Sequence, residues 1–259
     1  MKSPFSINSF KQKKSVPTTA KHALVSDSMP FAVIESYKST RTNLMFTLSS
    51  EERKWVAVTS ALPGEGKTLT CANLAITFAQ TGAKTLIIDA DLRKPRLART
   101  FGVPSHPGIS DAICGFCDLD NVIHKTDIDN FYVIPAGTIP PNPAELLASN
   151  EMKNLLEKLN DMGFEYIFFD TPPINIVTDA AAITRITAGT LLVVRSNVTT
   201  KESLQSAVGA LNQAGVKILG FILNGVDLEK NSYRYGKYGK YGKYSSYGYS
   251  YGRNSSIKN

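Results

Sequence analysis

The chain is predicted to be an α/β protein with a doubly wound, mostly parallel sheet. Short, continuously apolar segments alternate along the sequence with segments of helical periodicity. Strands that are buried on both faces have this uniform apolar character, and helices that connect such strands cover both sides of a parallel sheet. A glycine-rich loop at 61–68 follows the first apolar segment and leads directly into a helical one, which is the connection expected in a P-loop fold.

The elements follow from these patterns in chain order. A helix is expected at 30–46, ahead of the first strand. The strands are expected at 54–60, 84–90, 131–136, 165–170, 190–195 and 217–224. The intervening helices are expected at 68–80, 151–162, 178–186 and 201–214, and the segment 108–123 is typical of a helix that runs into a turn.

Composition divides the chain into three parts: a polar arm at 1–29, one folded domain at 30–229 and a tail at 230–259. The tail has one aliphatic residue, and its glycines recur at every third position over 236–242, so we expect it to be disordered. Exposed phenols on such a segment suit modification better than packing. The tail holds eight of the chain's 11 tyrosines: Tyr233, Tyr235, Tyr238, Tyr241, Tyr244, Tyr247, Tyr249 and Tyr251.

The net charge of +7 is that of the tail alone, which has seven Lys and Arg and no acidic residue. The remainder of the chain is neutral, so we expect no nucleic acid as a partner of the folded domain. The lysines of the arm at 1–29 fit a solvated arm or a weak attraction to an anionic membrane surface, and we favour the solvated arm.

The sequence contains no apolar run near the roughly 20 residues of a membrane-spanning helix, and no hydrophobic segment typical of a signal peptide. A cytoplasmic location is therefore expected. Cys114 and Cys117 form a C-x-x-C pair, but no second pair follows, so a structural role is favoured over redox or zinc chemistry.

The loop ALPGEGKT at 61–68 has the composition of a phosphate-binding loop. Its backbone N–H groups, its lysine and a hydroxyl for Mg²⁺ suit a nucleotide, although Ala61 replaces the first glycine of the G-x-x-x-x-G-K-[ST] pattern. The alternative is a glycine-rich strand-to-helix connection without a ligand. The expected nucleotide contacts are Gly64, Glu65, Gly66, Lys67, Thr68 and Leu69.

Three aspartates follow apolar strands. Asp89 and Asp91 end the strand in LIIDADLRKP, and Asp170 ends the strand in YIFFDTPP. Because ligands bind beyond the carboxyl ends of strands in an open α/β sheet, these carboxylates should meet the loop. They could bind Mg²⁺ or deprotonate a hydroxyl, whereas a single aspartate at a strand end is usually a capping or turn residue.

The segments ALPGEGKT, LIIDADLRKP and FFDTPP, together with the tyrosine-rich C-terminus, resemble the Walker A, A′ and B motifs of the bacterial tyrosine kinases of the CpsD/CapB type, from capsular and exopolysaccharide assembly. The resemblance extends from about Pro30 to the end of the chain. The segment ESYKSTR is similar to the family's E-x-x-R-x-x-R oligomerisation motif, whose three positions are Glu35, Lys38 and Arg41.

The resemblance implies a protein-tyrosine kinase that transfers the γ-phosphate of ATP to its own C-terminal tyrosines, in trans within an oligomer. Lys67 would neutralise the phosphates, and Asp89 would orient or deprotonate the tyrosine hydroxyl, with Asp91 as a further catalytic residue. Asn224 would lie near the adenine. The implied Mg²⁺ ligands are Thr68, Asp91 and Asp170.

The resemblance also implies partners. Kinases of this type without a membrane span are switched on by a transmembrane adaptor, which would recruit this chain to the inner face of the cell membrane. A cognate tyrosine phosphatase and a ring-like homo-oligomer are implied as well. One alternative is an ATP-dependent switch of the MinD/ParA kind, but those proteins have a signature lysine where this chain has Leu62. Another is a tail that adheres to nucleic acid or matrix.

Overall fold

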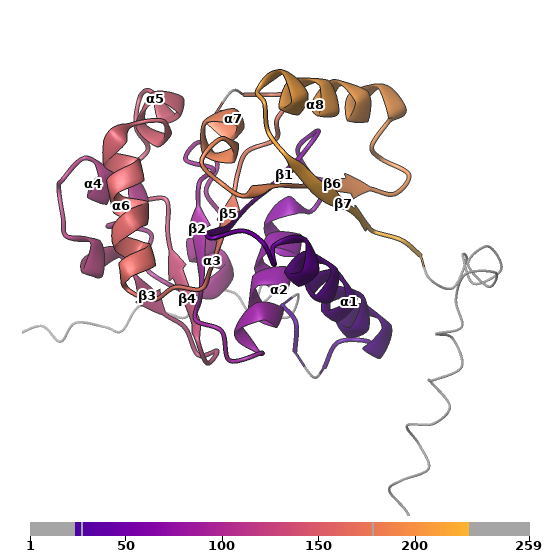
Figure 1. The fold of residues 1–259 in the computed structure, drawn as a ribbon, viewed down its shortest axis with the longest axis horizontal. Coiled ribbons are helices and arrows are strands. Elements are labelled where there is room, and N and C mark those ends of the chain that lie inside the picture. Colours follow the sequence, from indigo (N-terminus) through magenta and orange to yellow (C-terminus); the bar gives the residue numbers. More distant parts are fainter. Residues whose placement is uncertain (1–23, 27, 178, 228–259) are drawn as a thin grey trace, which may run out of the picture. The chain divides into compact units, whose positions relative to one another are not determined.

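The computed structural model describes residues 24–26, 28–177 and 179–227, and its centre is a seven-stranded sheet (Figure 1). The strand order is β3-β4-β2-β5-β1-β6-β7, and every neighbouring pair is parallel except β3 and β4. This confirms the predicted doubly wound, mostly parallel sheet. The strands are β1 (Lys54–Ser60), β2 (Thr85–Asp89), β3 (His124–Lys125), β4 (Phe131–Ile134), β5 (Tyr166–Asp170), β6 (Gly189–Arg195) and β7 (Ile218–Asn224).

Each predicted strand and helix is present, with ends that differ by at most two residues. The short elements α3, α5 and β3 were not predicted, whereas the segment 108–123 contains the expected helix and turn. The helices are α1 (Phe31–Thr47), α2 (Lys67–Ala79), α3 (Leu97–Phe101), α4 (Ile109–Ile113), α5 (Pro143–Leu147), α6 (Asn150–Asp161), α7 (Asp179–Thr184) and α8 (Lys201–Gln213), with a 3₁₀ turn η2 (Leu119–Val122).

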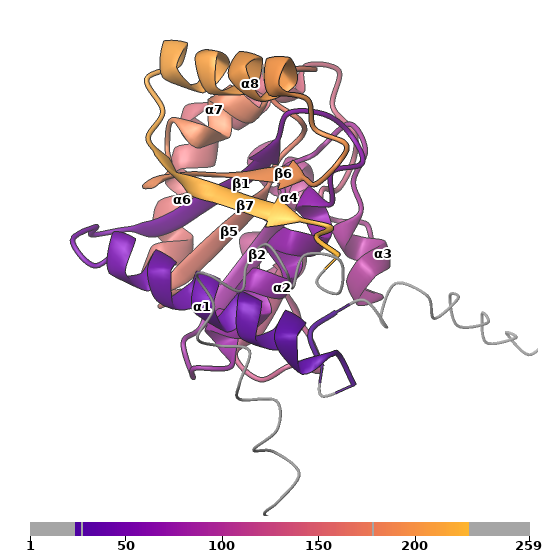
Figure 2. The same ribbon diagram turned by 90° about the vertical axis from the view of Figure 1, so that its right-hand side faces the viewer.

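Side chains of the central strands alternate between two apolar layers. On β1, Val56 and Val58 pack in the layer that contains α1 and α2, whereas Trp55 and Ala57 pack in the layer that contains α6. Figure 2 shows α1 and α2 on one side of the strands and α8 on the other. This alternation explains the uniform apolar strands of the sequence, because both faces of the sheet are buried.

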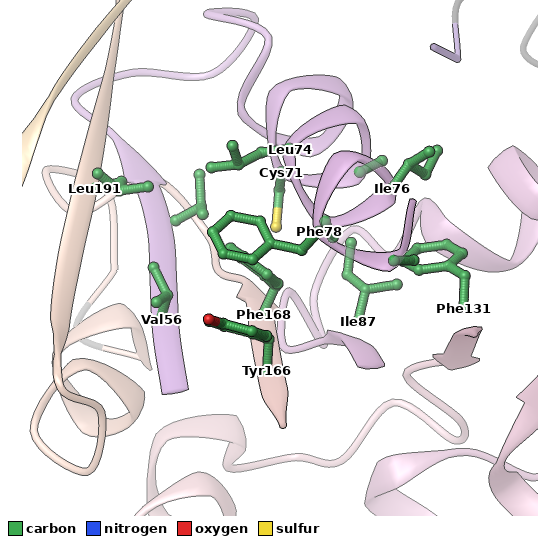
Figure 3. Close-up of a cluster of buried hydrophobic side chains, with 14 of the residues drawn as sticks. Val56, Cys71, Leu74, Ile76, Phe78, Ile87, Phe131, Tyr166, Phe168 and Leu191 are labelled. Atoms are coloured by element: carbon green, nitrogen blue, oxygen red, sulfur yellow. The ribbon is translucent and has the colours of Figure 1, made fainter. Parts of the chain in front are cut away.

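The core beneath α2 fixes the position of that helix (Figure 3). The ring of Phe78 lies 4.5 Å from that of Tyr166 and 5.2 Å from that of Phe168, measured between centroids. Cys71 and Leu74 of the same helix are fully buried beside them. Burying each large side chain stabilises the fold by about 1.5–3 kcal/mol, so α2 is anchored along its length and its N-terminus is held at the carboxyl edge of the sheet.

The ends of the chain differ in what the structure describes. Leu24 and Val25, which belong to the expected arm, are buried in the α1–α2 layer, and the backbone N–H of Val25 donates to Asn73 Oδ1 at 2.8 Å. Chain contacts define a compact unit that ends at Asn224. The tail tyrosines at 233–251 lie outside the described residues. Within the part of the chain that the structure describes, no helix combines the length and the apolar character needed to cross a membrane.

Candidate active site

The loop between β1 and α2 depends on two glycines with left-handed backbone conformations. Gly64 has φ of 83° and Gly66, the N-cap of α2, has φ of 89°. A Cβ atom at Gly66 would lie 2.1 Å from Asn224 Nδ2. The Asn224 amide also donates to the carbonyl oxygen of Glu65 at 3.0 Å. The end of β7 therefore packs directly on the loop, at a position that has room only for glycine.

The side chain of Glu65 supports the loop from within. It is fully buried, and its Oε2 accepts a hydrogen bond from the backbone N–H of Leu62 at 2.9 Å. Its Oε1 accepts from the hydroxyl of Thr199, in the segment after β6. Glu65 is absent from the lining of the cavity beside the loop, whereas its neighbours Gly64, Gly66 and Lys67 are part of that lining.

The cavity has a volume of about 540 Å³. Thr68 and Leu69, from the first turn of α2, line it together with Asp91. Ala61, which replaces the first glycine of the loop pattern, is buried in the layer beneath α8. A small apolar residue thus fits the start of this loop, and the departure from the pattern leaves the strand–loop–helix connection intact.

Lys67 joins two aspartates at the carboxyl edge of the sheet. Its Nζ lies 3.1 Å from Asp91 Oδ2 and 3.4 Å from Asp170 Oδ1. The three side chains are 11%, 9% and 1% exposed, so the ion pairs are almost dry. Burial opposes the charge of Lys67, but Asp170 and Asp91 outweigh it and raise the pKa of the amine. The lysine therefore stays charged, as neutralising phosphates requires.

Asp89 is fully buried beneath this cluster and accepts bonds from the backbone. Its Oδ2 accepts from the N–H groups of Arg96 and Leu97, each at 2.9 Å, and its Oδ1 accepts from the N–H of Asp91 at 3.3 Å. Burial, with a smaller contribution from Asp170, raises its pKa to about 7. Asp89 holds the segment that carries Asp91, and of the two only Asp91 lines the cavity.

Asp170 supplies an oxygen that fits a cation. Its Oδ2 is buried and has no hydrogen-bond partner in the described part of the chain. Burial raises the pKa of Asp170, while Lys67 and the Thr68 hydroxyl lower it. The described residues contain no group of three or more His, Cys, Asp or Glu that could hold a metal ion alone. Mg²⁺ at a phosphate site needs only one or two carboxylates besides waters and phosphate oxygens, so Thr68, Asp91 and Asp170 fit that requirement.

Two arginines of the cavity wall have partners that sequence reasoning missed. Arg93 donates to the buried carboxylate of Asp179, at the start of α7, with Nε 2.6 Å and Nη2 3.2 Å from its oxygens. Arg195, at the end of β6, donates from Nη1 to the carbonyl oxygen of Gly64 at 2.6 Å. The strand-end position of Arg195 is the one sequence signal that could have placed it at this edge.

The residues expected to mediate oligomerisation lie on α1. Lys38 Nζ is 2.8 Å from Glu35 Oε1, and both side chains are about two-fifths exposed, at 44% and 41%. Arg41 instead turns toward α2, where its Nη1 donates to the carbonyl oxygen of Thr77 at 2.7 Å. Glu35 and Lys38 are thus accessible to another chain, while Arg41 joins α1 to the helix that begins at the loop.

Comparison with known proteins identifies the family. Residues 53–213 match the family model described as AAA domain. The chain is 41% identical over 202 residues to the tyrosine-protein kinase YwqD of Bacillus subtilis. The aligned region covers 78% of this chain and 84% of YwqD. It is 40% identical over 200 residues to the tyrosine-protein kinase CpsD of Streptococcus pneumoniae, and this aligned region covers 77% of this chain and 87% of CpsD. The chain belongs to the bacterial tyrosine-protein kinases. This confirms the expected family and enzyme class.

Solved structures agree. The kinase domain of the Escherichia coli tyrosine kinase ETK matches with a TM-score of 0.75 at 36% identity, covering 84% of this chain and 83% of that domain. The chimerical protein CapA2B2 matches with a TM-score of 0.73 at 34% identity, covering 79% and 89%. MinD of Pyrococcus horikoshii, solved with Mg-ADP, matches at a TM-score of 0.55 and 24% identity, which shows the shared P-loop fold alone. The tyrosine kinase is therefore favoured over the MinD-like switch.

Proposed function

We propose that this tyrosine kinase transfers the γ-phosphoryl group of ATP to tyrosines in the 230–259 segment of another copy, and so regulates capsular or exopolysaccharide synthesis and export. The observation that carries the proposal is the cluster of Lys67, Asp91 and Asp170 beside a glycine-rich loop that lines a cavity. In the transfer, the bond between the γ-phosphorus and the bridging oxygen breaks, a bond to the tyrosine oxygen forms, and ADP leaves with the bridging oxygen.

The loop is the proposed nucleotide site. Backbone N–H groups at the start of α2 and the ammonium of Lys67 favour the terminal phosphates. The Glu65 side chain keeps the loop in shape rather than contacting the nucleotide, because it is buried against Leu62 and Thr199. The family resemblance assigns Asn224 to the adenine end of the site, and in the structure its amide lies against Gly66 of the loop.

Mg²⁺ is the proposed metal. When bound, it would neutralise the charge that develops on the transferred phosphoryl group. Thr68, Asp91 and Asp170 would hold it, and the observation in favour is the buried Oδ2 of Asp170, which has no hydrogen-bond partner among the described residues. Before metal binding, the ammonium of Lys67 lies within 3.1 Å of Asp91 Oδ2 and 3.4 Å of Asp170 Oδ1, and it opposes the effect of burial on Asp170, whose pKa is raised overall.

Asp89 is assigned two linked tasks. It holds the segment 91–97 in place through backbone N–H groups, and so positions Asp91 at the cavity. Its pKa of about 7 also suits the general base that the family resemblance implies, and this role requires the tyrosine hydroxyl to approach a carboxylate that does not itself line the cavity. Asp91 is then the carboxylate of the two that lines the cavity, where the metal and the acceptor would meet.

The partners follow from the family. We propose a transmembrane adaptor that docks on this kinase and recruits it from the cytoplasm to the inner face of the cell membrane, and a tyrosine phosphatase that reverses its modification. The likeness to the chimerical protein CapA2B2 supports a kinase that works with a second component. A ring-like homo-oligomer would use Glu35 and Lys38 on the exposed side of α1.

The proposal is tested by replacing the loop lysine. Lys67→Met should lower incorporation of phosphate into the protein's own tyrosines by at least about 100-fold, because it removes the cation that opposes the phosphates. The measurement is intact mass after incubation with ATP, Mg²⁺ and the cytoplasmic tail of a candidate adaptor. Lys158→Met, on the exposed side of α6, is the matched control and should incorporate phosphate like the wild type. Labelling of the Lys67→Met protein at the wild-type rate would refute the assigned site.

A further inference from the structure

One wall of the cavity is not used by the chemistry described above. Lys94, Arg96 and Thr100, from the segment after β2 and the start of α3, line the cavity beyond Asp91. Pro173 and Ile176, from the segment after β5, line the same cavity, and Ile176 is 56% exposed. We call Lys94, Arg96, Thr100, Pro173 and Ile176 the acceptor wall. It offers an apolar surface for a ring together with two cations.

The two cations of the acceptor wall differ from the other basic residues of the cavity. Lys67 is paired with two aspartates and Arg93 with Asp179. Arg195 is bound to a loop carbonyl. Lys94 and Arg96 are exposed, and within the described residues neither forms an ion pair. The wall therefore carries uncompensated positive charge next to the site where the acceptor must enter.

The backbones of these two residues are fixed to the site. The N–H of Lys94 donates to Asp91 Oδ1 at 3.1 Å, and the N–H of Arg96 donates to Asp89 Oδ2 at 2.9 Å. The backbones of both residues are thus hydrogen bonded to the carboxylates that serve the transfer. Lys94 follows Asp91 by three residues and Arg96 follows it by five. An extended chain therefore separates their Cα atoms from that of Asp91 by at most about 10 and 18 Å. The fixed backbones keep both side chains close to Asp91, so an anion bound by them would lie near the reacting hydroxyl.

The unmodified tail does not match this wall in charge. Its tyrosines repeat at every third residue from Tyr235 to Tyr247, and a lysine precedes Tyr238, Tyr241 and Tyr244. Like charges on tail and wall repel each other. A phosphotyrosine adds about −1.5 to −2 charges and acceptor oxygens that match a guanidinium. Three residues of extended chain span about 10 Å. This does not exceed the largest distances that separate Lys94 and Arg96 from Asp91, about 10 and 18 Å.

We propose that Lys94 and Arg96 form a phosphotyrosine subsite, so that the kinase prefers a tyrosine whose neighbour three residues away is already phosphorylated. The ring of the acceptor tyrosine lies on Pro173 and Ile176, and the neighbouring phosphate lies on the two cations. This inference rests on the proposed function and adds to it an order in which the tail tyrosines are phosphorylated. The first phosphate on a tail is slow, each later one is faster, and partly modified tails are scarce.

The experiment uses peptides of residues 233–246 with one acceptor tyrosine, at 235, and phenylalanine at the other tyrosine positions. One peptide is unmodified, a second carries phosphotyrosine at 238 and a third carries it at 244, which changes the net charge equally but places the phosphate nine residues away. The full-length protein, activated by the adaptor tail, should use the second peptide with a kcat/KM about ten-fold above the other two. That factor corresponds to about 1.4 kcal/mol.

The double variant Lys94→Gln, Arg96→Gln should bring this ratio close to one, because it keeps the two backbone N–H groups but removes both charges. Arg99→Gln, on the exposed part of α3, is the matched control and should keep the ratio. Equal use of the second and third peptides by the wild type, or an unchanged ratio in the double variant, overturns the subsite alone. Absence of phosphate on every peptide and on the tail overturns the proposed function as well.

Discussion

Gly66 is the residue at which the loop, α2 and β7 meet. Its φ of 89° strains any side chain, and a Cβ would meet Asn224 Nδ2 at 2.1 Å. The amide cannot retreat freely, because it is hydrogen bonded to the carbonyl oxygen of Glu65. Glycine at this position is therefore required by the packing of β7 on the loop as well as by the phosphate.

We predict that Gly66→Ala lowers ATP affinity by at least about ten-fold and the free energy of unfolding by about 1–3 kcal/mol, from strain and the displaced Asn224. Gly64→Ala is the matched control, since Gly64 has φ of 83° but a Cβ there meets no atom of the described residues within 4 Å. Nucleotide titration and urea unfolding of both variants check this. Similar losses in the two variants would show that backbone strain alone is responsible, and the contact with Asn224 would carry no weight.

Sequence reasoning at this scale found the residues whose position in a strand, loop or helix start implies their place. Lys67, Asp91 and Asp170 meet because Lys67 begins α2, Asp170 ends β5 and Asp91 follows the end of β2 by two residues, all at one edge of the sheet. The partner of Arg93 lies 86 residues away in sequence, and no local pattern specifies such a pair. The orientation of the Glu65 side chain could not be predicted from the sequence either, because it depends on a hydrogen bond from Thr199, in the segment after β6.

At the scale of elements, the short helix α4 depends on one carboxylate. Asp111 Oδ2 accepts from the backbone N–H of Gly108 at 2.8 Å and from that of Thr138 at 3.2 Å, so it closes the start of α4 and binds the segment after β4. Burial opposes ionisation of Asp111, but the bonds to Thr138 and Gly108 outweigh it and lower the pKa. A lowered pKa means that the ionised group stabilises the folded state.

Asp111→Ala should lower the free energy of unfolding by about 1–3 kcal/mol at pH 7, because it leaves the two N–H groups without their acceptor. The stabilisation is present above the unfolded pKa of about 3.9 and is lost as the pH falls through the lower folded value. Wild type and variant should therefore converge in acid. Urea unfolding at pH 7 and at decreasing pH measures this, with Asp118→Ala, at an exposed position, as control. A cost no larger than that of the control would contradict the role of Asp111.

The long elements of this kinase were predictable, whereas the short elements α3, α5 and β3 were not. α2 and α6 have enough turns for an apolar period to appear, and the central strands are uniformly apolar. α3 and α5 have five residues each and β3 has two. Their formation depends on contacts made by the folded chain, such as the bonds from the α3 N-terminus to Asp89. Leu24 and Val25 were assigned to the arm because two apolar residues give no period.

At the scale of the whole molecule, the proposed function needs a tail that reaches the active site of another copy. A glycine-rich segment of the length of 230–259 has a mean extension on the order of 30 Å in a coil. This is comparable with the diameter of a small domain. In an oligomer built through α1, a coil of this length would span about one domain diameter, which is the distance that the proposed transfer between neighbours requires.

Phosphate transfer should consequently occur between chains. A Lys67→Met chain with its tail, mixed with a wild-type chain truncated after residue 229, should be labelled on its tail tyrosines, because the first chain supplies the acceptor and the second supplies the site. The Lys67→Met chain alone and the truncated chain alone are the controls, and the truncated chain is shown to be active on an added peptide of residues 233–246. Adding a Glu35→Ala, Lys38→Ala change to both chains should lower the labelling if α1 brings them together. Transfer confined to chains that carry both an intact Lys67 and a tail would mean that the reaction occurs within one chain, and the tail would then have to fold back on its own domain.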